Sequence, residues 1–163
     1  MGSRTYTISG TNLTLANQAV TLAFLNPPAN GPAIEILRCW AGQSSTTTGA
    51  MQRVQLNTQV SAFPTLVSAT PVRHNPGDAV SVITGGTAGA AGTCGVNASA
   101  EGAGGKTVVL SDTFYNLSGW LWVPTPEERI QLNPGGTSGF GIHFPAAPGT
   151  LTGWNFGITY REL

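Results

Sequence analysis

The chain has 163 residues, a formal net charge of zero and only 9% charged residues, against about 25% in an average soluble domain. Its length is typical of one domain with its own core. Its neutrality argues against a nucleic-acid partner, because that affinity comes largely from clustered Lys and Arg. A positive mean hydropathy with so little charge is unusual for a soluble monomer. We therefore expect other subunits to cover part of the surface.

The first 18 residues are polar, and "RTYTI" at 4–8 alternates in the manner of an extended strand. We expect residues 1–18 to form an extended N-terminal arm that adds a strand to a neighbouring subunit. The start of the sequence has no apolar stretch of the kind found in secretion signals. The longest apolar run, at 19–25, is too short to cross a membrane, so no membrane partner is expected.

Short β-rich runs separated by Gly and Pro turns fill the rest of the chain, and no helical periodicity is visible. The runs at 33–41 and 50–60 flank a Ser/Thr/Gly turn and predict a long hairpin. Other expected strands lie at 19–25, 65–69, 79–83, 107–110, 113–116, 119–123, 129–132 and 139–144.

The last run, "WNFGITYREL", is the clearest strand, because Trp154, Phe156, Ile158 and Tyr160 share one face. The pattern predicts a single all-β domain over residues 19–163, built as an antiparallel β-sandwich or barrel. The spacing of the strands leaves jelly-roll, immunoglobulin-like and barrel topologies open.

A Gly/Ala-rich tract at 85–105 is too long for a connecting turn. We expect a loop here. It is either a mobile surface loop or a loop that becomes ordered against a neighbouring subunit.

The sequence offers little catalytic or metal-binding chemistry. His74 lies in a Pro/Gly turn, and alternation places His143 on the outer face of a strand. Cys39 and Cys94 lack metal-ligand spacing and read as two free or buried thiols, although a disulfide between them stays open. We expect no catalytic residues, no metal, no cofactor, no small-molecule substrate and no enzymatic activity.

Four tryptophans, Trp40, Trp120, Trp122 and Trp154, are the main candidates for a binding surface. They could stack against sugar rings, but tryptophans on one face of a sandwich strand are more often core or interface anchors.

The densest charge cluster is Glu127, Glu128 and Arg129 in "VPTPEER". Adjacent residues of a strand point to opposite faces, so the two carboxylates cannot easily converge as a glycosidase pair would. Pro124 and Pro126 interrupt backbone hydrogen bonding, so the stretch predicts a corner between two strands. Arg129 is expected to pair with a neighbouring glutamate at the surface.

The order of motifs resembles that of small bacteriophage capsid decoration, or cement, proteins. The likeness runs over about residues 33–163. It rests on "IEILR", "QSSTTTGAMQRVQL", "PVRHNPGDA", the distinctive "WVPTPEERI" and "WNFGITYREL". The arm and the Gly-rich tract carry no matching motif.

The resemblance implies a β-sandwich or jelly-roll fold, commonly trimeric, with no catalytic residues. It implies a virion protein on the outer surface of the capsid, assembled in the host cytoplasm, that bridges subunits of the major capsid protein. An alternative is a fibre or host-attachment module that binds glycans through exposed Trp. The residues expected at partner interfaces are Arg4, Tyr6, Ile8, Trp120, Trp122 and Arg129.

Overall fold

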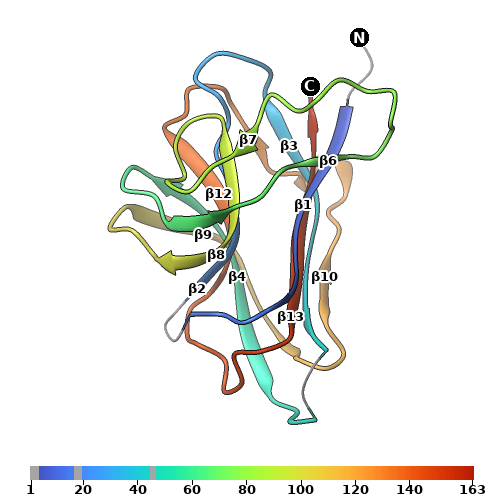
Figure 1. The fold of residues 1–163 in the computed structure, drawn as a ribbon, viewed down its shortest axis with the longest axis vertical. Coiled ribbons are helices and arrows are strands. Elements are labelled where there is room, and N and C mark those ends of the chain that lie inside the picture. The colour runs from blue at the N-terminus through green and yellow to red at the C-terminus, as the bar shows by residue number, and fades with distance from the viewer. Residues whose placement is uncertain (1–3, 17–19, 45–46) are drawn as a thin grey trace.

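A computed structural model describes residues 4–16, 20–44 and 47–163 of the chain. Over these residues the protein is all-β, and two sheets pack face to face (Figure 1). Strand pairing is antiparallel except at the two-residue strand β7. The one helical element in the described part is the 3-10 turn η1, Pro126–Glu128. The predicted antiparallel β-sandwich is confirmed.

The two sheets share the strands almost equally. Sheet A has the order β10 (Trp120–Trp122), β3 (Ile34–Gln43), β13 (Trp154–Glu162), β1 (Arg4–Leu13) and β6 (Val72–Arg73), with β11 (Gln131–Leu132) also on β3. Sheet B has the order β5 (Thr65–Ser68), β8 (Thr93–Ala100), β2 (Val20–Leu25), β12 (Ser138–Phe144), β4 (Met51–Val60) and β9 (Gly105–Tyr115), with β7 (Thr84–Gly85) on β8.

The strand pairs are nested along the chain. Strand β1 pairs with β13, β2 with β12, β3 with β10, and β4 with β9. Further pairing of β3 with β13 and of β4 with β12 completes two four-stranded cores. Successive strands of these cores alternate between the sheets, except that β4 and β9, the two innermost strands of the nested order, are neighbours in sheet B. This is the eight-stranded, double-sheet order of a jelly roll.

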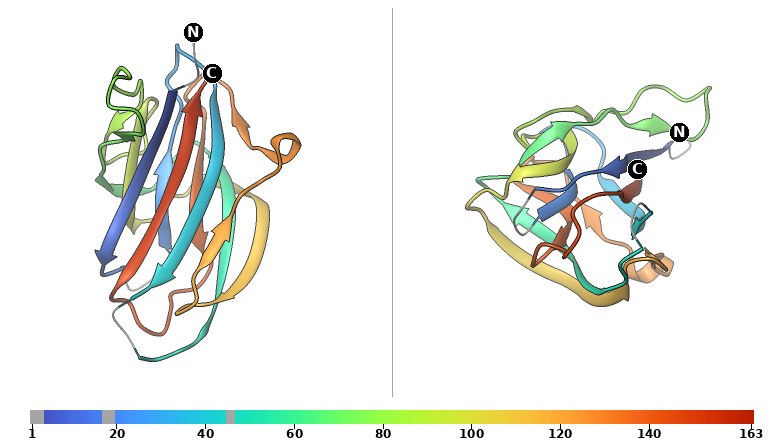
Figure 2. Two further views of the ribbon diagram at one scale, coloured as in Figure 1. Left: turned by 90° about the vertical axis from the view of Figure 1, so that its right-hand side faces the viewer. Right: turned by 60° about the horizontal axis from the view of Figure 1, so that its bottom comes forward.

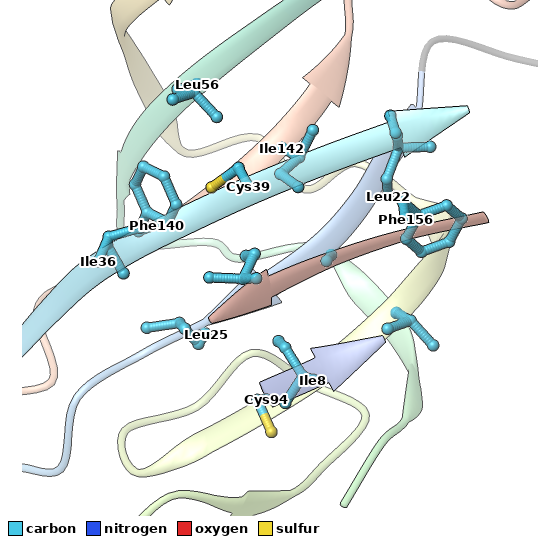
Figure 3. Close-up of a cluster of buried hydrophobic side chains, with 14 of the residues drawn as sticks. Ile8, Leu22, Leu25, Ile36, Cys39, Leu56, Cys94, Phe140, Ile142 and Phe156 are labelled. Carbon is cyan, nitrogen blue, oxygen red and sulfur yellow. The ribbon is translucent and has the colours of Figure 1, made fainter. Parts of the chain in front are cut away.

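The core lies between the sheets and follows the predicted alternation. On β13, Trp154, Phe156, Ile158 and Tyr160 are fully buried. Figure 3 shows Ile36 and Cys39 from sheet A beside Phe140 and Leu56 from sheet B, which together fill the space between the layers. Burial of these apolar side chains supplies most of the driving force for folding.

Residues 61–104, between β4 and β9, form an insertion that covers part of the outer face of sheet B. Phe24, on β2, packs there against Phe63 with ring centroids 5.7 Å apart. Leu66 and Ala98 complete this second small cluster. All six residues of β2 are therefore buried, because the core covers one face and the insertion covers the other.

The predicted N-terminal arm is wrong for its described part. Residues 4–13 form β1 inside sheet A, paired residue for residue with β13 from Arg4↔Glu162 to Gly10↔Phe156. Tyr6 and Ile8 point into the core and are fully buried. The alternation in "RTYTI" reports a half-buried strand, and its partner strand comes from the same chain.

The prediction of a loop over residues 85–105 is also wrong for its centre. Residues 93–100 form β8, which pairs with both β2 and β5. Glycine here serves close packing, since a Cβ on Gly95 would lie 2.7 Å from both Leu66 Cβ and Val67 O. Only the flanking residues 86–92 and 101–104 are turns or irregular segments.

The predicted hairpin of 33–41 with 50–60 does not form, although both strands exist. Strand β3 belongs to sheet A and β4 to sheet B, so the connection between them crosses from one layer to the other. Conversely, the expected strands at 107–110 and 113–116 are one continuous strand, β9.

The expected strand at 79–83 is an irregular segment held by a buried carboxylate. Glu162 Oε1 accepts hydrogen bonds from Ser81 Oγ at 2.7 Å and from the Val82 N–H at 2.8 Å. Ser81 Oγ also lies 2.7 Å from Tyr160 Oη, and burial raises the pKa of Tyr160 well above its ordinary value. These bonds replace the strand pairing that the segment lacks.

Gly157→Ala is expected to lower the free energy of unfolding by about 1–3 kcal/mol, the usual cost of overpacking. A Cβ at this position, on a central strand, would lie 2.3 Å from Trp40 Cζ2 and 2.7 Å from Ile8 O. The backbone oxygen cannot move without disturbing the pairing of β1 with β13. Urea unfolding checks the value. In the matched control, Gly149→Ala, the added Cβ meets nothing within 4 Å, so a similar loss there would refute the steric explanation.

Candidate functional site

The charged stretch "VPTPEER" is a corner, as predicted. Strand β10 ends at Trp122, and a 3-10 turn, η1, follows, before β11 begins at Gln131. Glu128 Oε2 accepts hydrogen bonds from Thr125 N at 3.4 Å and Thr125 Oγ1 at 3.1 Å, which caps the turn. Glu127 and Glu128 are exposed. The pair has the geometry of a capped turn at the surface.

Arg129 pairs with a glutamate distant in sequence rather than with its neighbours. Its Nη1 lies 3.3 Å from Glu35 Oε2, on β3. Arg161 Nε, on β13, lies 2.5 Å from the same oxygen. The carboxylate of Glu35 therefore joins the corner to the centre of sheet A. The predicted ion pair is present, but the expected partner was wrong because β3 could not be placed beside the corner from sequence.

The six residues expected at partner interfaces do not gather on one surface. Tyr6 and Ile8 belong to the core. Trp120 is 8% exposed, and its Nε1 donates to Asp112 Oδ2 at 3.0 Å, joining β10 to β9. Trp122 and Arg4 are half-buried. Within one copy of the chain, these side chains mostly hold the sandwich together.

A tryptophan platform for sugars is not present. Trp154 is fully buried and Trp120 nearly so. Trp40 lies against Gly157 on the outer face of sheet A, and the guanidinium of Arg38 sits 5.0 Å from its ring centroid. Trp40 and Trp122 are half-buried, so at most two of the four tryptophans offer part of a ring to solvent.

A charged cluster that the sequence did not predict lies on the outer face of sheet B. Glu101, at the end of the insertion, receives hydrogen bonds from Lys106 Nζ at 2.6 Å and Thr21 Oγ1 at 2.8 Å. The Thr21 N–H also donates to it, at 2.5 Å, and His143 Nδ1 lies 3.3 Å away. We name these four residues, Glu101, Lys106, Thr21 and His143, the Glu101 clasp.

The Glu101 clasp connects the insertion to strands β2, β9 and β12. Burial acts to raise the pKa of Glu101, but its bonds to His143, Lys106 and Thr21 outweigh burial and lower that pKa to about 2. His143 does lie on the outer face of its strand, as expected, yet only 7% of it is exposed because Glu101 covers it. The adjoining cavity measures about 10 Å³, which leaves no room for a substrate.

A hollow of about 380 Å³ lies at the end of the sandwich where β13 begins. Gln43 Nε2 donates to Thr150 O at 3.0 Å and Thr152 O at 2.7 Å. Asn116 Nδ2 donates to Gln43 Oε1 at 2.6 Å and Thr48 O at 3.0 Å. The side-chain amide hydrogens of Gln43 and Asn116 are thus used to connect loops.

Large apolar side chains are exposed at both edges of the sandwich. At the edge formed by β9 and β10, Leu121 is 63% and Val123 is 62% exposed, and Val108 and Val109 of β9 are also exposed. At the edge formed by β6, Val72 is 66% and Val80 is 76% exposed. These two edges are the surfaces of this fold best suited to contact other proteins.

Over residues 4–16, 20–44 and 47–163, no group of three or more His, Cys, Asp or Glu side chains is placed to hold a metal ion. The two cysteines are free, and both are buried. Burial raises the pKa of Cys94 to about 12. Among the described residues, no helix is long and apolar enough to cross a membrane.

Comparisons with known proteins give no relative for this chain. No protein-family model matches it, and neither a curated protein nor a solved structure does.

Proposed function

We propose that this chain is a structural virion protein that decorates the outside of a bacteriophage capsid and stabilises it by bridging subunits of the major capsid protein. The observation that carries the proposal is a charge-poor jelly roll that exposes large apolar side chains at both edges. The proposed role is non-enzymatic. The protein acts as a homo-oligomer, and the resemblance to capsid decoration proteins implies a trimer.

The surface chemistry supports this role over a role in charge-driven binding. Specific interfaces take their energy from apolar and aromatic anchors with few charges at the centre. Leu121 at one edge and Val80 at the other supply such anchors. A stable contact on a shell would bury more than about 1,000 Å² in total.

The test uses undecorated shells of the phage whose genome encodes this chain. The purified protein should sediment with the shells to a saturable ratio, and it should raise the temperature at which the shells rupture. Leu121→Ser with Val80→Ser is expected to weaken shell binding by about tenfold or more, since two exposed anchors are lost. Absence of binding by the wild-type protein, at concentrations where it is folded, would refute the proposal.

A further inference from the structure

The two edges of sheet A carry opposite charges, and these charges lie at the same level along the strands. At one edge, β6 places Val72 opposite Thr7 and Arg73 opposite Tyr6. Each pair belongs to a row of residues that lie side by side across the sheet. The row of Val72 and Thr7 continues through Thr159 to Arg38. The row of Arg73 and Tyr6 continues through Tyr160 to Ile36. The rows thus reach β3, on the far side of the sheet, at residues 36–38.

The corner that carries Glu127 lies at the other end of these rows. Trp122 pairs with Cys39 and Gln131 pairs with Glu35, so residues 123–130 run beside residues 36–38. The Ile36 N–H donates to Ile130 O at 2.9 Å, which fixes the corner there. Figure 2, left panel, shows the orange corner at one edge of sheet A and the green insertion at the other.

Each edge presents one exposed valine and one exposed charge. Val123 and Glu127 are exposed at the corner, and Val72 and Arg73 at β6. Glu127 has no hydrogen-bond or ion-pair partner within the part of the chain that the structure describes, and Glu128 beside it adds a second carboxylate. Arg129 does not neutralise them, because it pairs with Glu35.

The β6 edge carries the opposite charge on a firm support. Arg73 Nη1 donates to the backbone oxygen of Asp78, and His74 bonds to Thr7, with Nε2 2.7 Å from Oγ1. The segment that follows is fixed to sheet A through Tyr6 Oη, which donates to Ala79 O at 2.9 Å. The carboxylate of Asp78 is half-buried, and its Oδ1 accepts a hydrogen bond from Asn75 Nδ2 at 3.4 Å.

We propose that copies of this chain associate head to tail, with the β6 edge of one copy against the β10 corner of the next. Val72 then meets Val123, and Arg73 meets Glu127 and Glu128. The two edges differ, so the contact is heterologous. Because they lie at the same level, each step brings no displacement along the strands, as a closed ring requires, and we expect a ring rather than a helical filament.

This inference extends the proposed function by assigning the contact between copies, and it is tested without any shell. Its failure would therefore leave shell binding by a monomer, or by another oligomer, untouched. Failure of shell binding would equally leave the ring intact.

The test is a charge exchange followed by light scattering and sedimentation velocity. Wild type should be one discrete oligomer. Arg73→Glu and Glu127→Arg should each weaken association by about tenfold or more, because like charges then face each other. The double variant, with the two charges exchanged, should restore the wild-type mass. Val123→Ser should weaken association independently of charge.

Arg53→Glu is the matched control, because Arg53 is exposed on the outer face of sheet B and should leave the mass unchanged. Near-ultraviolet circular dichroism checks that each variant is folded. A monomeric wild type would overturn the inference, as would single variants with wild-type mass or an exchange that fails to restore it. A ladder of increasing masses would overturn the closed ring.

Discussion

Trp154→Ala is expected to lower the free energy of unfolding by about 3–5 kcal/mol, the range found for truncating a buried Phe or Trp. The Trp154 side chain is fully buried. It meets Phe144 edge-on at 4.9 Å between centroids and Phe114 at 6.4 Å. Its Nε1 also donates to Thr150 O at 2.9 Å. The substitution removes a large apolar volume and one of the two donors to that carbonyl, which keeps its bond from Gln43 Nε2.

Urea unfolding of the purified variant measures this loss, and Trp40→Ala is the matched control. Trp40 is half-buried on the outer face of sheet A, where solvent can fill the space that it leaves. We expect a loss of about 1–2 kcal/mol there, since little cavity remains. If the two variants were equally destabilised, the core between the sheets would not be the main source of stability.

Glu101→Gln is expected to destabilise the protein at neutral pH and to have no effect near pH 2. The folded-state pKa of Glu101 is lowered from 4.5 to about 2. A lowered carboxyl pKa contributes stability that is fully present above the unfolded pKa and is lost as the pH falls through the folded pKa. The contribution of Glu101 should therefore disappear between about pH 4.5 and pH 2.

Solvent screening reduces the loss of stability expected for Glu101→Gln. The Glu101 side chain is 23% exposed, so we expect about 1–3 kcal/mol at pH 7 rather than the full value of the shift. Urea unfolding of wild type and variant at pH 7, 4 and 2 measures it. Arg53→Gln, at an exposed charge on the outer face of sheet B, should show no difference at any pH. A Glu101→Gln effect that persisted at pH 2 would mean that the charge is not its origin.

Much of the fold follows from alternation within single strands. The runs at 19–25, 33–41 and 50–60 correspond to β2, β3 and β4, and the face assigned to the last strand is the buried face of β13. Alternation reports which face of a strand is buried. It does not report the sheet to which a strand belongs, so β3 and β4 were joined as a hairpin although they lie in different layers.

The errors at the N-terminus and in the Gly-rich tract have one physical cause. The partner of β1 is β13, at the far end of the chain, and β8 is paired with β2 and β5. Long-range pairing leaves no local signal in sequence. Glycine, which favours flexible loops, is also the residue that permits close packing, and composition alone does not separate these uses.

The motifs of the sequence do not predict the Glu101 clasp, because only the fold brings its four residues together. Thr21, Glu101 and His143 lie on different segments, and no spacing rule links them. One signal was available. Between Asp78 and Asp112, Glu101 and Lys106 are the only charged residues. Two opposite charges isolated in an apolar stretch are a reasonable prediction of an ion pair.

The nested pairing of the strands has a consequence for synthesis of the protein on the ribosome. Of the strands in sheet A, β1 is synthesised first and β13 last. The two are neighbours, and Arg4 pairs with Glu162. Sheet A cannot be completed until the C-terminal strand leaves the exit tunnel. Contacts this distant in sequence are associated with folding in milliseconds to seconds. A chain truncated before Trp154 would lack the strand between β1 and β3, and both would keep open edges that invite aggregation.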